Sequence, residues 1–338
     1  MEANGSFSAF RAEPAGLRSL TKLTERPRVY APDSCGRMRM SPDGRFAMLN
    51  NGILWNLEED RVVFEKEYFW MTGGFTADSQ LCLLGRQNLH GALREDEILL
   101  LCAETGETVS TFREKARCLV LEGEGRFFLM AREEPGELRF SRIRTEDGIC
   151  TAQWSYAWTE PELIPMNLYL AENGKALYVE LGSLQYRRGS GPSRLLKFRP
   201  DTGEALFQGE VKALVCPQSF TEKTIVTENG QVLDAADGRE LRRFGDGTSM
   251  PVALLPDGIT VACGAEDRAC EGSALVCYNS RSGEKIAKEI VWMDPLSPFP
   301  VDVFPREIAA GPDGKRLLYV FQVNGRTKAF LCEADWSD

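Results

Sequence analysis

One sequence phrase returns along the whole chain: a short apolar run, a turn of the Pro-Asp-Gly type, and then an alternating apolar strand. The clearest copies lie at 40–49, 255–261 and 311–320. Weaker copies fill the gaps, with their turns at 75–79, 121–125, 170–174 and 220–224. From Gly44 to Gly314 the chain advances 270 residues over six intervals, so the mean period is 45 residues. Self-similarity at this period predicts an all-β fold of stacked four-stranded units, a seven-bladed β-propeller.

A second turn marks the hairpin between the third and fourth strands of each unit. Asp-Gly, Thr-Gly or similar signals occupy six positions, at 59–61, 105–107, 147–148, 201–204, 237–239 and 282–284. A seventh would fall after Asp335, so the last unit is expected to lack its own outer strand. Residues 17–23 alternate apolar and polar side chains as outer strands do, and we expect them to complete the last blade, because ring closure removes an exposed sheet edge.

The predicted organisation is a single domain. An N-terminal extension at 1–34 contains the closing strand, and the propeller proper occupies 35–338. A repeat array grows with blade number, so this length fits one unit.

Two copies of the phrase carry a family motif. Ser-Pro-Asp-Gly-Arg-Phe at 41–46 and Gly-Pro-Asp-Gly-Lys-Arg-Leu-Leu-Tyr at 311–319 resemble the WD40-like repeats of bacterial propellers, the PD40 type seen in the TolB family and in prolyl oligopeptidase propellers. The resemblance covers 35–335 as a repeat pattern, without the Gly-His and Trp-Asp dipeptides of eukaryotic WD40 repeats. It implies a propeller fold and a scaffold role rather than a reaction.

Charge and hydropathy limit the class of partner. Forty basic residues against fifty acidic ones give a net charge of −10, and an acidic surface repels phosphate backbones, so no nucleic-acid partner is expected. The sequence has no apolar stretch of about 20 residues, so no membrane span is expected. The first residues carry an acid, Glu2, where a signal peptide needs base. We therefore expect a cytoplasmic protein, and a monomer.

The ten cysteines stand at irregular spacing within apolar runs. This pattern favours reduced core thiols over a disulfide framework. Cys263 and Cys270 flank a charged loop, so a functional thiol pair there stays open as an alternative.

Catalytic signatures are missing from the sequence. His90 is the only histidine, which excludes His-rich zinc and iron sites. We find no nucleophile elbow, no phosphate-binding Gly-Lys-Ser/Thr loop and no Cys-x-x-Cys pair. The Asp-Gly turns lack the regular series of oxygen ligands that a calcium loop needs. No catalytic residue, no metal site and no cofactor is therefore expected.

Loop lengths indicate where a partner would bind. In propellers of this kind, the loops between second and third strands lie on the same face as the links between blades. Long loops of the first kind occupy 85–97, 181–194 and 264–273, and aromatic links occupy 68–71, 156–158 and 292–300. Large amphipathic rings suit a protein interface. The predicted partner-binding residues are Phe69, Trp70, His90, Trp158, Tyr186, Trp292 and Phe299.

Two functions are compatible with these features, and both stay open. The first is a non-enzymatic scaffold that binds a protein partner of unknown identity through the aromatic face. The second is an enzyme or small-ligand receptor with its site at the central channel. An enzyme should gather ionisable groups with shifted pKa values at the channel mouth, whereas a scaffold should show a broad apolar or aromatic patch. The tryptophans also have a second interpretation, as rings packed between blades.

Overall fold

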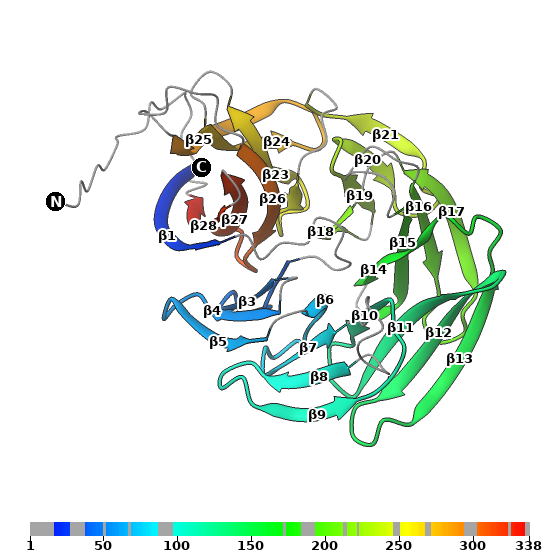
Figure 1. Ribbon diagram of the computed structural model, residues 1–338. Coiled ribbons are helices and arrows are strands. Elements are labelled where there is room, and N and C mark those ends of the chain that lie inside the picture. The colour runs from blue at the N-terminus through cyan, green and yellow to red at the C-terminus, as the bar shows by residue number, and fades with distance from the viewer. Residues whose placement is uncertain are drawn as a thin grey trace.

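The structure is a computed structural model, and seven antiparallel four-stranded sheets surround a central axis in it (Figure 1). It contains no α-helix among the residues it describes, and so none of membrane-spanning length. The described residues are 17–27, 38–49, 52–66, 69–86, 97–171, 174–183, 193–211, 215–221, 223–245, 251–267, 272–293, 303–323 and 326–334. The predicted all-β, seven-bladed propeller is confirmed.

Each blade runs outward from the axis in chain order, apart from the last. Blade 1 is β2 (Arg39–Met40), β3 (Phe46–Leu49), β4 (Ile53–Asn56) and β5 (Arg61–Glu65). Blade 2 is β6 (Phe69–Phe75), β7 (Leu81–Arg86), β8 (Glu97–Cys102) and β9 (Thr108–Phe112). Blade 3 is β10 (Cys118–Leu121), β11 (Phe127–Glu134), β12 (Glu137–Arg144) and β13 (Cys150–Ala157).

The remaining blades follow the same plan. Blade 4 is β14 (Ile164–Ala171), β15 (Ala176–Gly182), β16 (Ser193–Phe198) and β17 (Ala205–Val211). Blade 5 is β18 (Val215–Phe220), β19 (Thr224–Thr227), β20 (Gln231–Asp234) and β21 (Glu240–Arg243). Blade 6 is β22 (Val252–Leu254), β23 (Thr260–Asp267), β24 (Gly272–Asn279) and β25 (Lys285–Met293). Blade 7 is β26 (Val303–Ala310), β27 (Arg316–Val323), β28 (Arg326–Ala334) and β1 (Leu17–Pro27).

The ring closes through β1, as the sequence predicts. This strand pairs antiparallel with β28, from Leu17 opposite Ala334 to Pro27 opposite Arg326. It is longer than the predicted 17–23, and two register shifts interrupt it. Figure 1 shows the first and last strands of the chain side by side in one blade. The outer edge of β28 is therefore covered by the chain's own N-terminal strand.

The core consists of seven apolar clusters, one between each pair of neighbouring blades. Strand β3 shows how the sequence builds them. Phe46 and Met48 pack against blade 2, whereas Ala47 and Leu49 pack against blade 7. Successive side chains of a strand point to opposite faces, and both faces of a blade are covered by neighbours. The apolar runs in the repeats are therefore continuous where the strand is buried on both sides.

Internal hydrogen bonds stabilise the repeated turn, which also contacts the neighbouring blade. In blade 1 the Ser41 hydroxyl donates to Asp43 Oδ1 at 2.6 Å and accepts the Phe46 N–H at 2.9 Å. Gly44 has φ +75°, a conformation that favours glycine, and a Cβ there would lie 3.1 Å from the Pro312 ring of blade 7. Proline and glycine recur in this turn because the proline of one blade packs against the glycine of the next.

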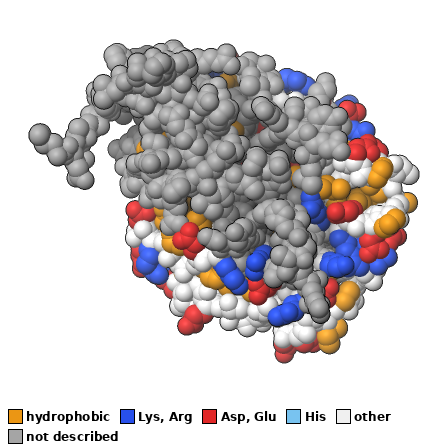
Figure 2. Space-filling model, in the orientation of Figure 1, with side chains coloured by type: hydrophobic (Ala, Val, Ile, Leu, Met, Phe, Trp, Pro, Cys, Tyr) orange, Lys and Arg blue, Asp and Glu red, His pale blue; other side chains and the backbone are white. Residues whose placement is uncertain are grey.

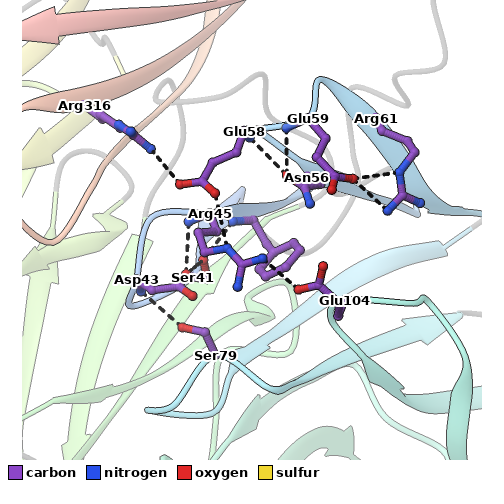
Figure 3. Close-up of polar contacts among 11 residues, drawn as sticks. Ser41, Asp43, Arg45, Asn56, Glu58, Glu59, Arg61, Ser79, Glu104 and Arg316 are labelled. Carbon is purple, nitrogen blue, oxygen red and sulfur yellow. Dashed lines mark hydrogen bonds and ion pairs between the residues drawn. The ribbon is translucent and has the colours of Figure 1, made fainter.

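The weaker copy of the turn in blade 2 has a serine in place of the glycine, and the structure shows why. Ser79 takes the glycine position with φ +61°. Its hydroxyl accepts the backbone N–H of Asp43 at 3.1 Å, which ties the turns of blades 1 and 2 together (Figure 3). Serine is less favourable than glycine in this backbone conformation, but its hydroxyl adds a hydrogen bond between the two blades.

Candidate functional site

The predicted partner-binding residues lie mainly outside the described side chains. The backbone places Phe69 and Trp70 in β6 and Trp292 in β25. His90, Tyr186 and Phe299 lie outside the described residues. Partner binding through these six residues stays a prediction.

Trp158 is the one predicted residue whose side chain is described, and it is buried. Its ring is 7% exposed and packs in the cluster between blades 3 and 4. The indole N–H donates to the carbonyl oxygen of Glu160 at 2.8 Å and lies 3.2 Å from that of Leu163. Trp158 thus follows the second interpretation, interblade packing, because its apolar ring and its polar edge are both satisfied within the protein.

The strand order defines two faces of the ring. Tight turns join first to second and third to fourth strands at one end of the blades, which we call the turn face. The opposite end, the loop face, is where β7 ends at Arg86 and β8 begins at Glu97. The long segments and aromatic links singled out in the sequence are bordered by strand ends at the loop face.

The described surface shows no broad apolar patch. Its exposed large hydrophobic residues are spread one per blade over blades 2 to 5: Val109, Ile149, Leu206 and Leu241. In the view of Figure 2, acidic and basic side chains of the described residues lie interspersed around the periphery. The described periphery therefore presents mixed charge in this view.

A cavity of about 860 Å³ lies at the turn-face mouth of the central channel. Inner strands of blades 1, 2, 3, 4 and 7 form its wall, and turn residues form its rim. The lining includes Arg39, Gly73, Gly74, Val120, Leu121, Leu170 and Ile308 in the wall, and Pro42, Ala77, Gly123, Glu124 and Asp201 at the rim. Its volume falls within the range of small-molecule sites.

Arg39 reaches across this channel. Its Nε donates to the Thr72 carbonyl oxygen of blade 2 at 3.0 Å, and its Nη2 donates to the Leu168 carbonyl oxygen of blade 4 at 2.7 Å. The guanidinium also lies over the Tyr169 ring, 5.4 Å from the ring centre. Burial lowers the pKa of Arg39, although arginine stays charged in proteins. One side chain of blade 1 thus bridges to two other blades through carbonyl oxygens.

Two glycines follow Thr72, whose carbonyl oxygen accepts the Arg39 hydrogen bond, in β6. A Cβ on Gly73 would lie 2.4 Å from Leu119 Cδ1 and 2.7 Å from Leu83 Cδ2, so no larger residue fits there. Gly74 has φ +100° at a register shift in β6, and an added Cβ would meet Arg39 Cδ at an ordinary 3.5 Å. Packing therefore requires glycine at 73, and the backbone conformation favours it at 74.

Three other charged residues that line the cavity, Glu122, Glu124 and Arg142, are paired locally. Arg142 donates to both carboxylate oxygens of Glu122, at 2.7 and 2.8 Å, and lies 3.7 Å from the centre of the Phe127 ring. The hydrogen bond with Glu122 raises the pKa of Arg142. Glu124 lies 3.5 Å from Arg126 in an exposed pair. None of these pairs involves Arg39, which meets no carboxylate among the described residues.

A chain of ion pairs links blades 7, 1 and 2 on the turn face (Figure 3). Glu58 lies 3.6 Å from Arg316 and 3.4 Å from Arg45, and Arg45 lies 2.8 Å from Glu104. All four side chains are more than a third exposed, so each pair contributes little by itself. The pairs thus bridge the interfaces between blades 7 and 1 and between blades 1 and 2.

Arg39 was not among the residues predicted from the sequence, although a signal was present. A charged residue stands between Met38 and Met40, in a short inner strand whose neighbours are apolar. A charge placed inside an apolar strand indicates a specific partner or ligand. The sequence predicted the central channel only as the general place for an enzyme or receptor site. Within the described part of the chain, no group of three or more ligating side chains could hold a metal ion.

Comparison with known proteins gives one solved structure that supports the fold. No protein-family model and no curated protein matches this sequence. The β-propeller domain of Cps50 (Swd1) from Myceliophteria thermophila is similar with TM-score 0.60 and 13% identity, over 93% of this chain and 99% of that one. Hydrazine synthase from Kuenenia stuttgartiensis gives TM-score 0.44 and 12% identity, over 87% of this chain and 77% of that one. The similarity to the Swd1 domain supports the β-propeller fold of this chain.

Proposed function

We propose that this protein is a non-enzymatic interaction or scaffold propeller that binds a protein partner through its loop face. The supporting observation is how the described ionisable groups are used. Many of their pKa shifts arise from hydrogen bonds to a neighbouring side chain, such as Arg45 with Glu104, Arg144 with Asp147 and Arg243 with Glu240. Burial causes the shifts of Arg39, Cys82 and Cys277. The hydrogen-bonded pairs lie on blades 1 and 2, 3 and 5, so the groups are distributed around the ring instead of converging on one reactive point.

The same proposal includes the repeat family, the class of partner, the cellular location and the oligomeric state. The Ser41 and Asp43 turn supports repeats of the bacterial TolB type, because both side chains hold the turn. The net charge of −10 supports a partner other than nucleic acid. We further propose that the protein is a cytoplasmic monomer that does not bind a membrane.

The alternative is an enzyme or small-ligand receptor at the central channel. One observation favours the receptor form of it, the cavity of about 860 Å³ with Arg39 in its wall. A ligand bound in this cavity would lie at the turn face, whereas the proposed partner binds the loop face.

The experiment compares tryptophan variants against a partner captured from the native cell and then purified. We expect Trp70→Ala or Trp292→Ala to weaken partner binding by about 2 kcal/mol with the free energy of unfolding unchanged, as at an interface hot spot. Trp158→Ala is the matched control, because loss of a buried tryptophan costs about 3–5 kcal/mol of stability. If Trp70→Ala and Trp292→Ala destabilise the fold as Trp158→Ala does, and leave the affinity of the remaining folded protein unchanged, the proposed face is wrong.

A further inference from the structure

The central channel holds one cation whose charge no described carboxylate balances. Arg39 lies partly buried in the cavity wall and makes its two hydrogen bonds to neutral carbonyl oxygens, those of Thr72 and Leu168. A charge taken out of water is costly unless it is paired, and carbonyl dipoles balance it only in part. The site is therefore arranged to gain from an added anion.

The guanidinium also keeps hydrogen-bond donors for such a ligand. An arginine carries five N–H donors, and the described contacts occupy one on Nε and one on Nη2. Among the described residues Nη1 makes no hydrogen bond, which leaves the Nη1 side of the fork unoccupied. A planar fork of this kind matches the two oxygens of a carboxylate and binds them in pairs.

The rest of the cavity defines what else the ligand must carry. Its wall includes the apolar side chains of Val120, Leu121 and Ile308. The rim carries the carboxylates of Glu124 and Asp201, which repel a ligand of high negative charge. The surroundings favour a singly charged anion with an apolar stem over a phosphate dianion.

We propose that the turn-face mouth of the central channel binds a carboxylate, with the Arg39 guanidinium as its anchor. The carboxylate belongs either to a free small acid or to an acidic side chain of an extended peptide, and both present the same two oxygens. This site goes beyond the proposed interaction role, because it lies at the end of the channel opposite the loop face. Loss of one function would leave the other measurable.

The test uses the full chain and titrates it with acetate, glutamate and a short amidated peptide containing one glutamate. Side-chain NMR of protein labelled with ¹⁵N-arginine should show one Nε–H signal that shifts saturably with each probe, and the signal should be absent from Arg39→Lys. By calorimetry, Arg39→Gln should weaken binding about tenfold or more, since a charge-assisted pair is lost. Arg61→Gln is the matched control, because it removes an exposed charge of the same blade and should change binding less than about twofold.

A second variant covers the case in which Arg39→Gln does not fold. Gly123 lies at the rim, its φ is not in the left-handed region, and an added Cβ would meet only Ala77 at an ordinary 3.7 Å. Gly123→Trp should fill the mouth of the cavity and weaken carboxylate binding at least as much, with Arg39 intact.

The outcomes separate the ligand sources. Equal affinity for free glutamate and the peptide assigns the site to small acids, and clearly tighter binding of the peptide assigns it to an acidic side chain. Tighter binding of inorganic phosphate than of acetate would overturn the assignment to a carboxylate. Absence of a saturable shift in the unmodified protein, or unchanged binding in Gly123→Trp, would overturn the site itself.

Discussion

Removal of the closing strand should open the ring. A chain that begins at residue 28 lacks all of β1 and leaves β28 with an uncovered edge. An exposed edge strand presents a row of unpaired N–H and C=O groups and acts as a template for another chain. We therefore expect the truncated protein to lose stability and to associate through blade 7.

The expected loss follows from the pairing. Nine residue pairs join β1 to β28, and each backbone hydrogen bond contributes about 0.5–1.5 kcal/mol net. Even half of the resulting total, about 2–7 kcal/mol, is a large part of the 5–15 kcal/mol that typically separates folded from unfolded protein. Because β1 pairs the start of the chain with its end, its loss also removes a covalent link between blade 7 and blade 1.

Urea unfolding followed by tryptophan fluorescence, with sedimentation velocity at several concentrations, measures both effects. The matched control begins at residue 17, so it keeps β1 and loses only the residues before it. A synthetic peptide of residues 15–29 added to the truncated chain should restore the midpoint of unfolding. The closing role of β1 is refuted if the chain without it unfolds at the same urea concentration as the control and stays monomeric.

Two further predictions concern the turns and the thiols. Gly44→Ala should lower the free energy of unfolding by about 2–3 kcal/mol, because alanine disfavours the left-handed backbone and its Cβ crowds Pro312. The control Gly136→Ala, at φ +83° with open space around it, should lower it by only about 1 kcal/mol. Equal losses in urea unfolding would contradict the packing role of the turn. In the native protein, iodoacetamide at pH 8 should modify exposed Cys150 and half-buried Cys102 before Cys277. A hydrogen bond with Thr105 lowers the pKa of Cys102, while burial raises the pKa of Cys277 to about 12 and protects it. Mass measurement after alkylation in denaturant without reductant should show all ten cysteines modified, and a shortfall of two would indicate a disulfide.

Much of the fold is predictable from local signals. The Pro-Asp-Gly turn at 42–44 carries its own hydrogen bonds, so the turn is predictable wherever this short sequence recurs, at 256–258 and 312–314. Because a strand has a period of two, residues 46 and 48 are expected to face one neighbouring blade and residues 47 and 49 the other, as the structure shows. The closing strand was predictable from a missing partner, although its extension to Pro27 was not.

The candidate site was harder to predict because it depends on contacts between distant residues. Arg39 and the Leu168 carbonyl oxygen are 129 positions apart, and only ring closure brings blades 1 and 4 to one channel. Gly73 looks locally like a weak point in a strand, and the packing that requires a glycine there is visible only beside Leu119 and Leu83. Trp158 lies in a link between two blades, where the sequence predicts a surface residue, but its ring is buried in the core between blades 3 and 4.

The most direct test of the interaction proposal is site-specific photocrosslinking in the native cell. A photoreactive phenylalanine analogue would replace His90, Tyr186 or Phe299 on the predicted loop face, and Glu59 or Asp237 on the turn face as matched controls. We predict that one and the same protein is crosslinked from at least two loop-face positions and from neither turn-face position. Equal crosslinking of that protein from both faces, or no recurrent protein at any loop-face position, would contradict the proposal.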